Sequence, residues 1–494
     1  MWLCINININ TSRMQLMKWQ LPNIEEKTIP KNFSKWVYLL IFVISFLFYI
    51  IFIFIVQNDN DAVFSQFNLI FIFFIIAPIL FGLSVMGFLY SFFFYEKVDA
   101  LIFNHYLKNM RLNWQIWGQS SINLIDYHYI TGIDNVSLKI MKIEGHSPIN
   151  PDKVIPISII RENDSSPLLH LFDKILLPMK SKLNILPSVT ILLNTNQDLE
   201  VIKNVLMTYS QLNELNIHQS NITFSNIIPS IDKINDWIDD NSIQNILLIN
   251  LLFDTETQLQ VTEYCCALLF SNDEEVLNQF PLKINLFRSL NTNLTNFNKD
   301  LEYFLDSKQV QREKINQAWT LYLPSPALHS FKATLFDPNS GIKLEPNKFY
   351  QLEINLGKLD YSHAWLALSL AADGIVKEQK GQIIATQNKD SINIMQLSDE
   401  TAYTPTKEDN IKGYYPTITC LSCLLLLFCI CLTIIFSLEE TDSEFLMQIG
   451  VFSFIAGLFI IGAIIVGTLY QRSSKEDDFI EMWFEEQDKI SNSI

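Results

Sequence analysis

The chain has 494 residues and is 49% apolar, so it is long enough to build a large hydrophobic core besides any membrane segments. Its formal net charge of −17 disfavours nucleic acid and anionic lipid headgroups as partners, because both are themselves negatively charged. We therefore expect no nucleic-acid partner.

The first feature along the chain is an apolar hairpin over residues 36–95, behind a mostly polar tail of residues 1–35. Residues 36–56 carry no charge and, at a rise of about 1.5 Å per residue, can cross a hydrocarbon core of about 30 Å. Residues 63–95 are also apolar and form the return helix. The long polar tail and the second apolar run argue against a cleaved signal peptide.

A second apolar hairpin over residues 415–470 follows a polar linker of residues 400–414 and precedes a tail of residues 471–494. Together the two hairpins predict four membrane-spanning helices. No Asp, Glu, Lys, Arg or His interrupts the apolar runs, so the usual sign of an ion path is missing and anchoring is favoured over transport.

The charges beside the hairpins predict their orientation. The charged residues of the two short linkers inside the hairpins are all acidic, namely Asp59, Asp61, Glu439, Glu440, Asp442 and Glu444. The outer flanks carry the basic residues, namely Arg13, Lys18, Lys27, Lys31, Lys35, Lys97, Lys108, Arg111, Lys407, Lys412, Arg472 and Lys475. Because Lys and Arg stay on the cytoplasmic side, both termini and the large domain are expected to be cytoplasmic. The predicted location is a bacterial inner membrane, crossed several times.

Residues 96–135 are expected to form an amphipathic connector that leaves the membrane, with Trp114 and Trp117 at the interface. Residues 136–399 then alternate strand-like and helix-like blocks, which predicts a cytoplasmic α/β domain. Expected strands are residues 136–143, 189–194, 221–225, 245–253, 263–270, 350–356, 381–386 and 391–397; expected helices are residues 168–177, 198–209 with Asp198 as N-cap, 231–238 and 362–372.

Cysteines and histidines offer no clear catalytic or metal site. Cys420-x-x-Cys423 has the spacing of a metal or redox pair but lies in an apolar helix with no second pair, so packing is favoured. Cys265 and Cys266 belong to an apolar strand and are expected to be buried, in a reducing compartment. The histidines lack the spacing of metal ligands. We expect no catalytic, cofactor-binding or metal-binding residues and no cofactor.

The order of elements between residues 185 and 397 resembles a thiolase-like domain of the β-ketoacyl synthase type. In that family a buried strand precedes a Glu-Gly-Ala-type strand, and a Gly-His turn precedes a small-residue helix and two closing strands. The segments of this chain that carry the resemblance are residues 245–254, 262–270 (Thr-Glu-Tyr-Cys-Cys-Ala-Leu-Leu-Phe), 355–358 (Asn-Leu-Gly-Lys), 364–372, 383–386 and 392–395. The resemblance implies mixed sheets with helices.

The departures from that family concern its chemistry. Condensation needs a nucleophilic Cys at a strand-to-helix elbow, and the matching residues 223–226 (Thr-Phe-Ser-Asn) contain none. The Gly-His position reads Gly357-Lys358. His363, a few residues later, could serve as the catalytic histidine instead. A lone His at the start of an apolar helix is, however, more often a cap or a packing residue. The resemblance therefore implies the fold without its catalytic equipment.

Three functional hypotheses follow. The first is a non-catalytic, membrane-anchored scaffold or adaptor with protein partners in an envelope complex, since the layout resembles that of accessory membrane proteins of type VI secretion clusters. The alternative is a membrane-bound enzyme of acyl or lipid metabolism. The third is a channel or transporter, which measurable ion or solute flux in proteoliposomes would support despite the uncharged helices. The acidic tail with Phe479, Ile480, Met482, Trp483 and Phe484 is expected to be a solvated tail packed on its own domain, with an amphipathic helix that docks to a partner as the alternative. The oligomeric state stays open.

Overall fold

The computed structural model describes residues 17–31, 34–57, 75–158, 167–217, 222–225, 227–240, 244–254, 260–280, 283–377, 380–402, 420–428, 462, 466 and 474–490. Its contacts divide the chain into two compact units. The α/β unit comprises Met1–Leu21, Leu112–Thr406 and Ser493–Ile494, and the helical unit comprises Pro22–Arg111 and Lys407–Asn492.

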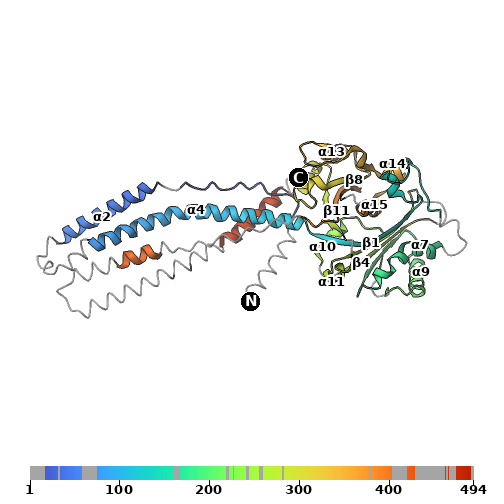
Figure 1. Cartoon of the computed structure of the whole chain (residues 1–494), viewed down its shortest axis with the longest axis horizontal. Helices are drawn as coiled ribbons and strands as arrows, with labels where there is room; N and C mark the ends of the chain where they lie inside the picture. Colours follow the sequence, from blue (N-terminus) through green and yellow to red (C-terminus); the bar gives the residue numbers. More distant parts are fainter. Residues whose placement is uncertain are drawn as a thin grey trace. The chain divides into compact units, whose positions relative to one another are not determined.

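The α/β unit is built on one mixed sheet of eleven strands, ordered β3-β2-β4-β5-β1-β6-β11-β10-β8-β9, with β7 paired to β11 (Figure 1). Parallel pairs hold β3, β2 and β4 together at one end and β10, β8 and β9 at the other. The strands are β1 (Ser121–Thr131), β2 (Thr190–Thr195), β3 (Ile222–Ser225), β4 (Asn245–Leu252), β5 (Tyr264–Ser271), β6 (Ile284–Phe287), β7 (Leu290–Thr292), β8 (Ile315–Leu321), β9 (Phe349–Gln351), β10 (Gly381–Asn388) and β11 (Ser391–Ser398). The α/β class with a mixed sheet is thus confirmed.

The longer helices of this unit separate onto the faces of the sheet. Alternate residues of β4 point into two different cores, with Leu248 in one and Leu247 in the other. Helices α7 and α9 contribute to the core on the Leu247 side, and α15 lies at the centre of the other. The helices are α5 (Val136–Ile140), α7 (Pro167–Leu176), α8 (Lys180–Leu183), α9 (Leu199–Leu212), α10 (Lys233–Asp239), α11 (Glu274–Leu277), α12 (Phe297–Asp306), α13 (Ser325–Phe336), α14 (Leu352–Leu356) and α15 (Ala364–Val376), with short 3₁₀ turns η3 (Leu177–Met179), η5 (Arg312–Lys314), η6 (Pro346–Lys348) and η7 (Tyr361–His363).

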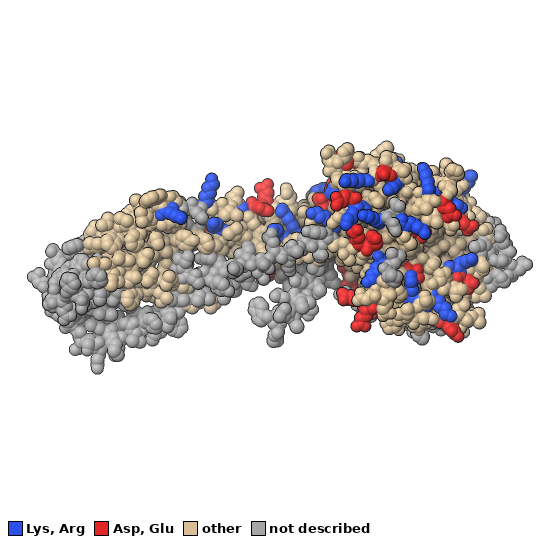
Figure 2. All heavy atoms as spheres, in the orientation of Figure 1, with Lys and Arg blue, Asp and Glu red and all other residues tan. Residues whose placement is uncertain are grey.

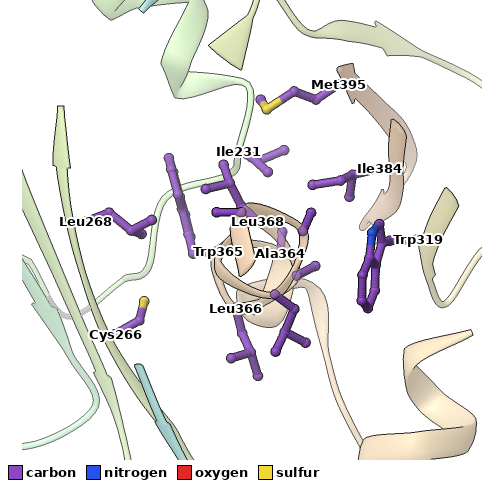
Figure 3. Close-up of a cluster of buried hydrophobic side chains, with 14 of the residues drawn as sticks. Ile231, Cys266, Leu268, Trp319, Ala364, Trp365, Leu366, Leu368, Ile384 and Met395 are labelled. Carbon is purple, nitrogen blue, oxygen red and sulfur yellow. The ribbon is translucent and has the colours of Figure 1, made fainter. Parts of the chain in front are cut away.

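Helix α15 is apolar nearly all round because strands surround it on both sides. Cys266 and Leu268 of β5 lie on one side of the helix, and Trp319, Ile384 and Met395 of β8, β10 and β11 lie on the other (Figure 3). Its residues from Ala364 to Ala372 are all buried. Such a helix is typical of a protein core.

Several predicted elements are confirmed, and others are wrong. Asp198 caps α9 as predicted, since its side chain accepts a hydrogen bond from the Glu200 amide at 2.9 Å. Residues 136–143, predicted as a strand, form the short helix α5 followed by a turn, and most of residues 350–356 form α14. The predicted connector 96–135 contains β1, which pairs with β5 and β6 in the middle of the sheet.

Trp114 and Trp117 do not lie at a membrane interface but are buried in the α/β unit, with exposed fractions of 2% and 7%. Trp19 packs between them, with ring centroids 6.5 Å from Trp114 and 5.1 Å from Trp117. Its indole Nε1 donates to the Ser289 carbonyl at 3.2 Å, and its ring also meets Phe304. These residues therefore act as core anchors of the unit.

The helical unit contains α2 (Lys35–Gln57), most of α4 (Ala77–Gly118) and helical segments at residues 420–428 and 474–490. Among the described residues, the stretch Pro78–Gly118 is long and apolar enough to cross a membrane, and the shorter stretch Lys35–Ile51 is apolar too. The described part thus contains one such helix rather than the two predicted hairpins. Residues 58–74 and most of residues 415–470, on which the hairpin predictions also depend, lie outside the described residues.

Large apolar side chains stand exposed on α2 and on the first half of α4. Trp36, Phe48 and Leu40 of α2 are 76%, 65% and 61% exposed, and Phe88 of α4 is 55% exposed. Figure 2 shows mainly uncharged atoms over these helices and a mixture of Lys, Arg, Asp and Glu over the α/β unit. The tail helix at residues 474–490 packs on α4 through Phe479, as the preferred interpretation of the tail predicts.

Candidate functional site

The turn between β3 and α10, where the family resemblance places a nucleophile, is closed by local hydrogen bonds. The Ser225 hydroxyl accepts from the Ile227 amide and donates to the Ile227 carbonyl, both at 3.0 Å, while Asn226 lies outside the described residues. The Pro229 carbonyl accepts the indole N–H of Trp365 at 2.7 Å. The turn is therefore fastened to the core helix α15.

Aromatic rings fill the space beneath this turn. The ring of Trp365 lies 5.7 Å from that of Trp237 and 6.4 Å from that of Phe270, and the Trp365 side chain has no solvent exposure. In Figure 3 the Trp365 side chain lies on the side of α15 that faces Leu268. Apolar packing occupies this position, and these three rings line neither the cavity of about 440 Å³ nor that of about 250 Å³.

Gly357-Lys358, at the family's Gly-His position, lies under an extended strap of residues 147–157. Gly357 has a φ of +84°, and a Cβ there would come within 2.0 Å of the Lys153 carbonyl oxygen. The Lys358 amide donates to the same carbonyl at 2.8 Å, and the Lys358 carbonyl accepts from the Thr262 amide at 2.7 Å. Glycine is needed here for backbone contact.

The strap also covers Glu263, which is 1% exposed at the start of the predicted Glu-Gly-Ala-type strand. The carboxylate of Glu263 accepts hydrogen bonds from the Ile157 amide at 2.7 Å and the Asp254 amide at 3.1 Å. Its own amide donates to the Ile155 carbonyl at 3.0 Å. A buried carboxylate held by backbone amides stabilises the loop arrangement.

His363 lies at the start of α15, and both of its ring nitrogens are engaged. Nδ1 accepts from the Asp360 amide at 3.0 Å and lies 2.9 Å from the Asp360 carboxylate, while Nε2 lies 2.7 Å from the Thr262 carbonyl. Since a carbonyl oxygen only accepts, Nε2 carries the proton. The capping box between Asp360 and His363 makes His363 a cap and packing residue, as predicted.

The two cysteines of β5 point into opposite cores, and neither is exposed. Burial raises the pKa of Cys266 to about 12 and raises that of Cys265 well above its ordinary value. The reactive form of a cysteine is the thiolate, so these thiols are unsuited to nucleophilic attack. Cys420 and Cys423 are free thiols, and no group of three metal-ligating side chains occurs among the described residues.

A cluster that the sequence analysis missed brings three hydroxyl groups to one carboxylate. Asp373, in the last turn of α15, accepts from the hydroxyls of Tyr127 at 2.7 Å, Tyr129 and Ser137. Burial and the neighbouring Asp373 charge raise the pKa of both tyrosines. An acid near a helix C-terminus opposes the helix dipole, and the three donors offset that cost. The period-two spacing of Tyr127 and Tyr129 was the available signal.

A cavity of about 440 Å³ opens beside α13 and α14. It is lined by Ile140, Lys142, Ser147, Lys332, Phe336, Pro346, Asn347, Phe349, Tyr350, Gln351, Ile354 and Asn355. The Lys332 ammonium lies 5.0 Å from the centre of the Phe349 ring, and the Asn355 amide nitrogen donates to the Ser147 hydroxyl at 2.9 Å. With two lysines and no acidic lining residue, the cavity suits a small anion or a polar chain end rather than a reaction.

The chain is similar in fold to condensing enzymes of known structure. One similar structure is a chain of the complex AntDE:AntF, a type II PKS acyl-carrier protein with its ketosynthase. The alignment covers 57% of this chain and 99% of that chain, at 12% sequence identity and a TM-score of 0.40. The alignment with 3-oxoacyl-(acyl carrier protein) synthase III from Pseudomonas aeruginosa covers 57% of this chain and 99% of that chain, at 8% sequence identity and a TM-score of 0.35. The alignment with a monomeric SCP2-thiolase like protein from Mycobacterium smegmatis covers 58% of this chain and 79% of that chain, at 9% sequence identity and a TM-score of 0.34. No protein-family model and no curated protein matches the sequence.

Proposed function

We propose that this protein is a membrane-anchored scaffold or adaptor whose α/β unit carries out no reaction of its own. One observation carries the proposal: the positions that would supply a nucleophile and a base are taken up by packing and backbone contacts. The Ser225 turn is tied to Trp365, Gly357 is pressed against the strap, and both nitrogens of His363 are engaged.

The anchoring part of the proposal is supported by the exposed apolar side chains of α2 and α4. Many exposed large apolar side chains on one helix mark contact with a partner or with lipid. The stretch Pro78–Gly118 is long and apolar enough to cross a hydrocarbon core, and residues 36–56 of α2 carry no charge. Together with the acidic linkers and basic flanks, this supports a bacterial inner-membrane protein with both termini and the α/β unit in the cytoplasm.

The partners that we propose are the lipid bilayer and other proteins of an envelope complex, of which a type VI secretion cluster is one setting. Affinity purification of the tagged, detergent-solubilised chain from its own host, with mass spectrometry of co-purifying proteins, tests this. Envelope-complex subunits support the scaffold. Acyl carrier protein or lipid enzymes support the alternative, a membrane-bound enzyme of acyl or lipid metabolism.

The absence of catalysis is tested on the purified full chain with acyl-thioester substrates, measuring thiol release and condensation product. The proposal expects neither above the uncatalysed rate. Ser225→Ala and Lys358→Ala are the informative variants, because both residues lie at the family's reactive positions and Lys358 is exposed. Turnover that either variant abolishes while thermal unfolding stays unchanged would overturn the scaffold and establish the enzyme.

A further inference from the structure

The helical unit contains a cavity of about 250 Å³ beside the part of α4 that follows its apolar half. The tail helix at residues 474–490, dark red in Figure 1, runs along α4 there. The lining residues are Lys27, Asp99, Ile102, Phe103, Tyr106, Lys475, Asp478, Phe479 and Met482. Three segments far apart in the sequence therefore build one cavity within this unit.

The charges that line this cavity balance. The Lys27 ammonium lies 3.2 Å from the Asp99 carboxylate, the Lys475 ammonium contacts the other oxygen of Asp99, and Asp478 adds a second carboxylate. The side chains of Lys27, Lys475 and Asp99 remain 47%, 38% and 28% exposed, so a ligand can reach all three. A simple anion would be attracted by two lysines and repelled by two carboxylates. A group that carries one charge of each sign fits both pairs.

Aromatic rings add a second feature that favours a cationic group. The Phe103 ring meets the Phe479 ring edge-on at 5.1 Å, and the Tyr106 ring lies 6.0 Å from Phe479. The Lys27 ammonium already lies 4.5 Å from the centre of the Phe103 ring. Ring faces attract ammonium groups, and the rings with Met482 also provide apolar surface for the first carbons of a chain.

The position of the cavity along α4 points to a lipid as the source of this group. The exposed apolar side chains of α4 include Phe88 and Tyr95, and the first charged residues of this helix, Glu96 and Lys97, follow directly. The Tyr95 hydroxyl lies 3.1 Å from the Lys475 ammonium. At about 1.5 Å per residue, Asp99 lies only about 6 Å further along the helix axis. Phospholipid headgroups occupy this depth if the apolar half of α4 lies in a bilayer.

We propose that this cavity binds the headgroup of a zwitterionic phospholipid with a primary ammonium, that is, a phosphoethanolamine headgroup. The phosphate lies beside Lys27 and Lys475, and the ammonium donates hydrogen bonds to Asp99 and Asp478 next to the ring faces. A trimethylammonium group cannot donate such bonds, and an anionic headgroup carries no ammonium to donate them and is repelled by both carboxylates. The volume is below the about 300–1,000 Å³ of pockets that enclose drug-sized ligands, so it suits a headgroup alone. This inference rests on the proposed membrane anchoring.

The test is native mass spectrometry of the full chain in detergent with equal amounts of phosphatidylethanolamine, phosphatidylcholine and phosphatidylglycerol of matched acyl chains. The wild type is expected to retain phosphatidylethanolamine preferentially. Lys27→Gln and Lys475→Gln are each expected to lower that retention about tenfold, the usual effect of losing one charge-assisted hydrogen bond. Lys489→Gln is the matched control, because Lys489 lies on the same tail helix, pairs with Glu486 and is outside the cavity.

Asp478→Asn gives a change of preference that loss of folding cannot produce. Removing one carboxylate leaves a net positive lining, so phosphatidylglycerol should gain on phosphatidylethanolamine by several-fold. Equal retention of all three lipids by the wild type, or lysine variants that behave like Lys489→Gln, would overturn the inference. Soluble phosphoethanolamine that binds as tightly as the lipid would overturn the lipid assignment.

Failure of this inference can be separated from failure of the proposed function. Resistance of each variant to extraction from membranes by alkaline carbonate is measured alongside. A chain that is extracted as a peripheral protein contradicts membrane anchoring itself. A chain that resists extraction yet shows no preference for phosphatidylethanolamine contradicts the headgroup site alone.

Discussion

Helices α15 and α2 are both almost entirely apolar, yet they differ in how far their side chains are exposed. Every residue of α15 from Ala364 to Ala372 is buried between strands, whereas Trp36 and Phe48 of α2 are 76% and 65% exposed. Apolar side chains leave water wherever they can, at roughly 25 cal/mol per Å² of surface buried. The protein itself supplies the apolar environment of α15, whereas under the proposed membrane anchoring lipid supplies that of α2.

The largest expected effect comes from opening the core around α15. Trp365→Ala removes a ring that packs on Trp237 and Phe270 and an indole that donates to Pro229, and such truncations cost about 3–5 kcal/mol. The urea midpoint of the full chain in detergent, followed by near-UV circular dichroism, measures the loss. Trp36→Ala is the matched control on α2 and should leave the midpoint unchanged. Equal shifts for both variants would remove the contrast between the helices.

A charge placed on α2 tests the other side of the comparison. Ile44 is 57% exposed near the middle of α2, and an arginine at the centre of a membrane helix costs about 2.5–3.5 kcal/mol on insertion scales. Ile44→Arg should therefore lower the membrane-integrated fraction, measured by carbonate extraction. Leu212→Arg changes a residue of α9 in the α/β unit that is 72% exposed, and it should have no effect. Full integration of Ile44→Arg would argue that α2 does not face lipid.

The same physics explains which elements the sequence allowed us to predict. Strands β4 and β5 are buried on both faces and, like the partly buried β2, contain continuous apolar runs. Helix α9 combines a helical period with a recognisable N-cap at Asp198. The cluster around His363 was foreseen only as a cap, because the Asp360 and His363 pair is local in sequence. Local signals of this kind survive without tertiary information.

The missed elements depend on contacts between distant residues. Val136 and Ile140 are β-branched and favour a strand, but at a spacing of four they form one buried face of α5, which packs on α15. Strand β1 was hidden because Asp126 and His128 interrupt its apolar pattern; the two side chains lie 3.5 Å apart, and Asp126 also pairs with the distant Lys182 at 2.9 Å. The Asp373 cluster joins residues about 240 positions apart, which no local pattern announces.

Replacing His363 has a smaller expected effect, which separates a cap from a catalytic base. His363→Leu keeps an apolar side chain but leaves the Thr262 carbonyl and the Asp360 amide without partners, at a cost of about 1–3 kcal/mol. The urea midpoint should fall accordingly. His363→Asn should recover part of the loss, because its amide both donates and accepts. Unchanged stability in both variants would contradict the capping role.

The smallest expected effect is a pH dependence confined to the α/β unit. Asp126 is 12% exposed at the bulge of β1; burial opposes its charge, but hydrogen bonds from His128 and Lys182, the latter at 2.9 Å, outweigh it and lower its pKa. The stabilisation is therefore complete above the unfolded-state pKa of about 3.9 and is lost as the pH falls through the lower folded-state value.

Asp126→Asn should remove this part of the acid sensitivity and cost roughly 0.5–1 kcal/mol at neutral pH, at the upper end of the range for ion pairs that solvent still reaches. Urea midpoints of both proteins between about pH 3 and 7 measure it. Asp173→Asn is the control, because Asp173 accepts a hydrogen bond at 3.0 Å from a neutral donor, the Tyr209 hydroxyl. Since α2 carries no acidic side chain, its membrane attachment should not change over the same range, and a parallel loss of attachment would show that the two units are not independent.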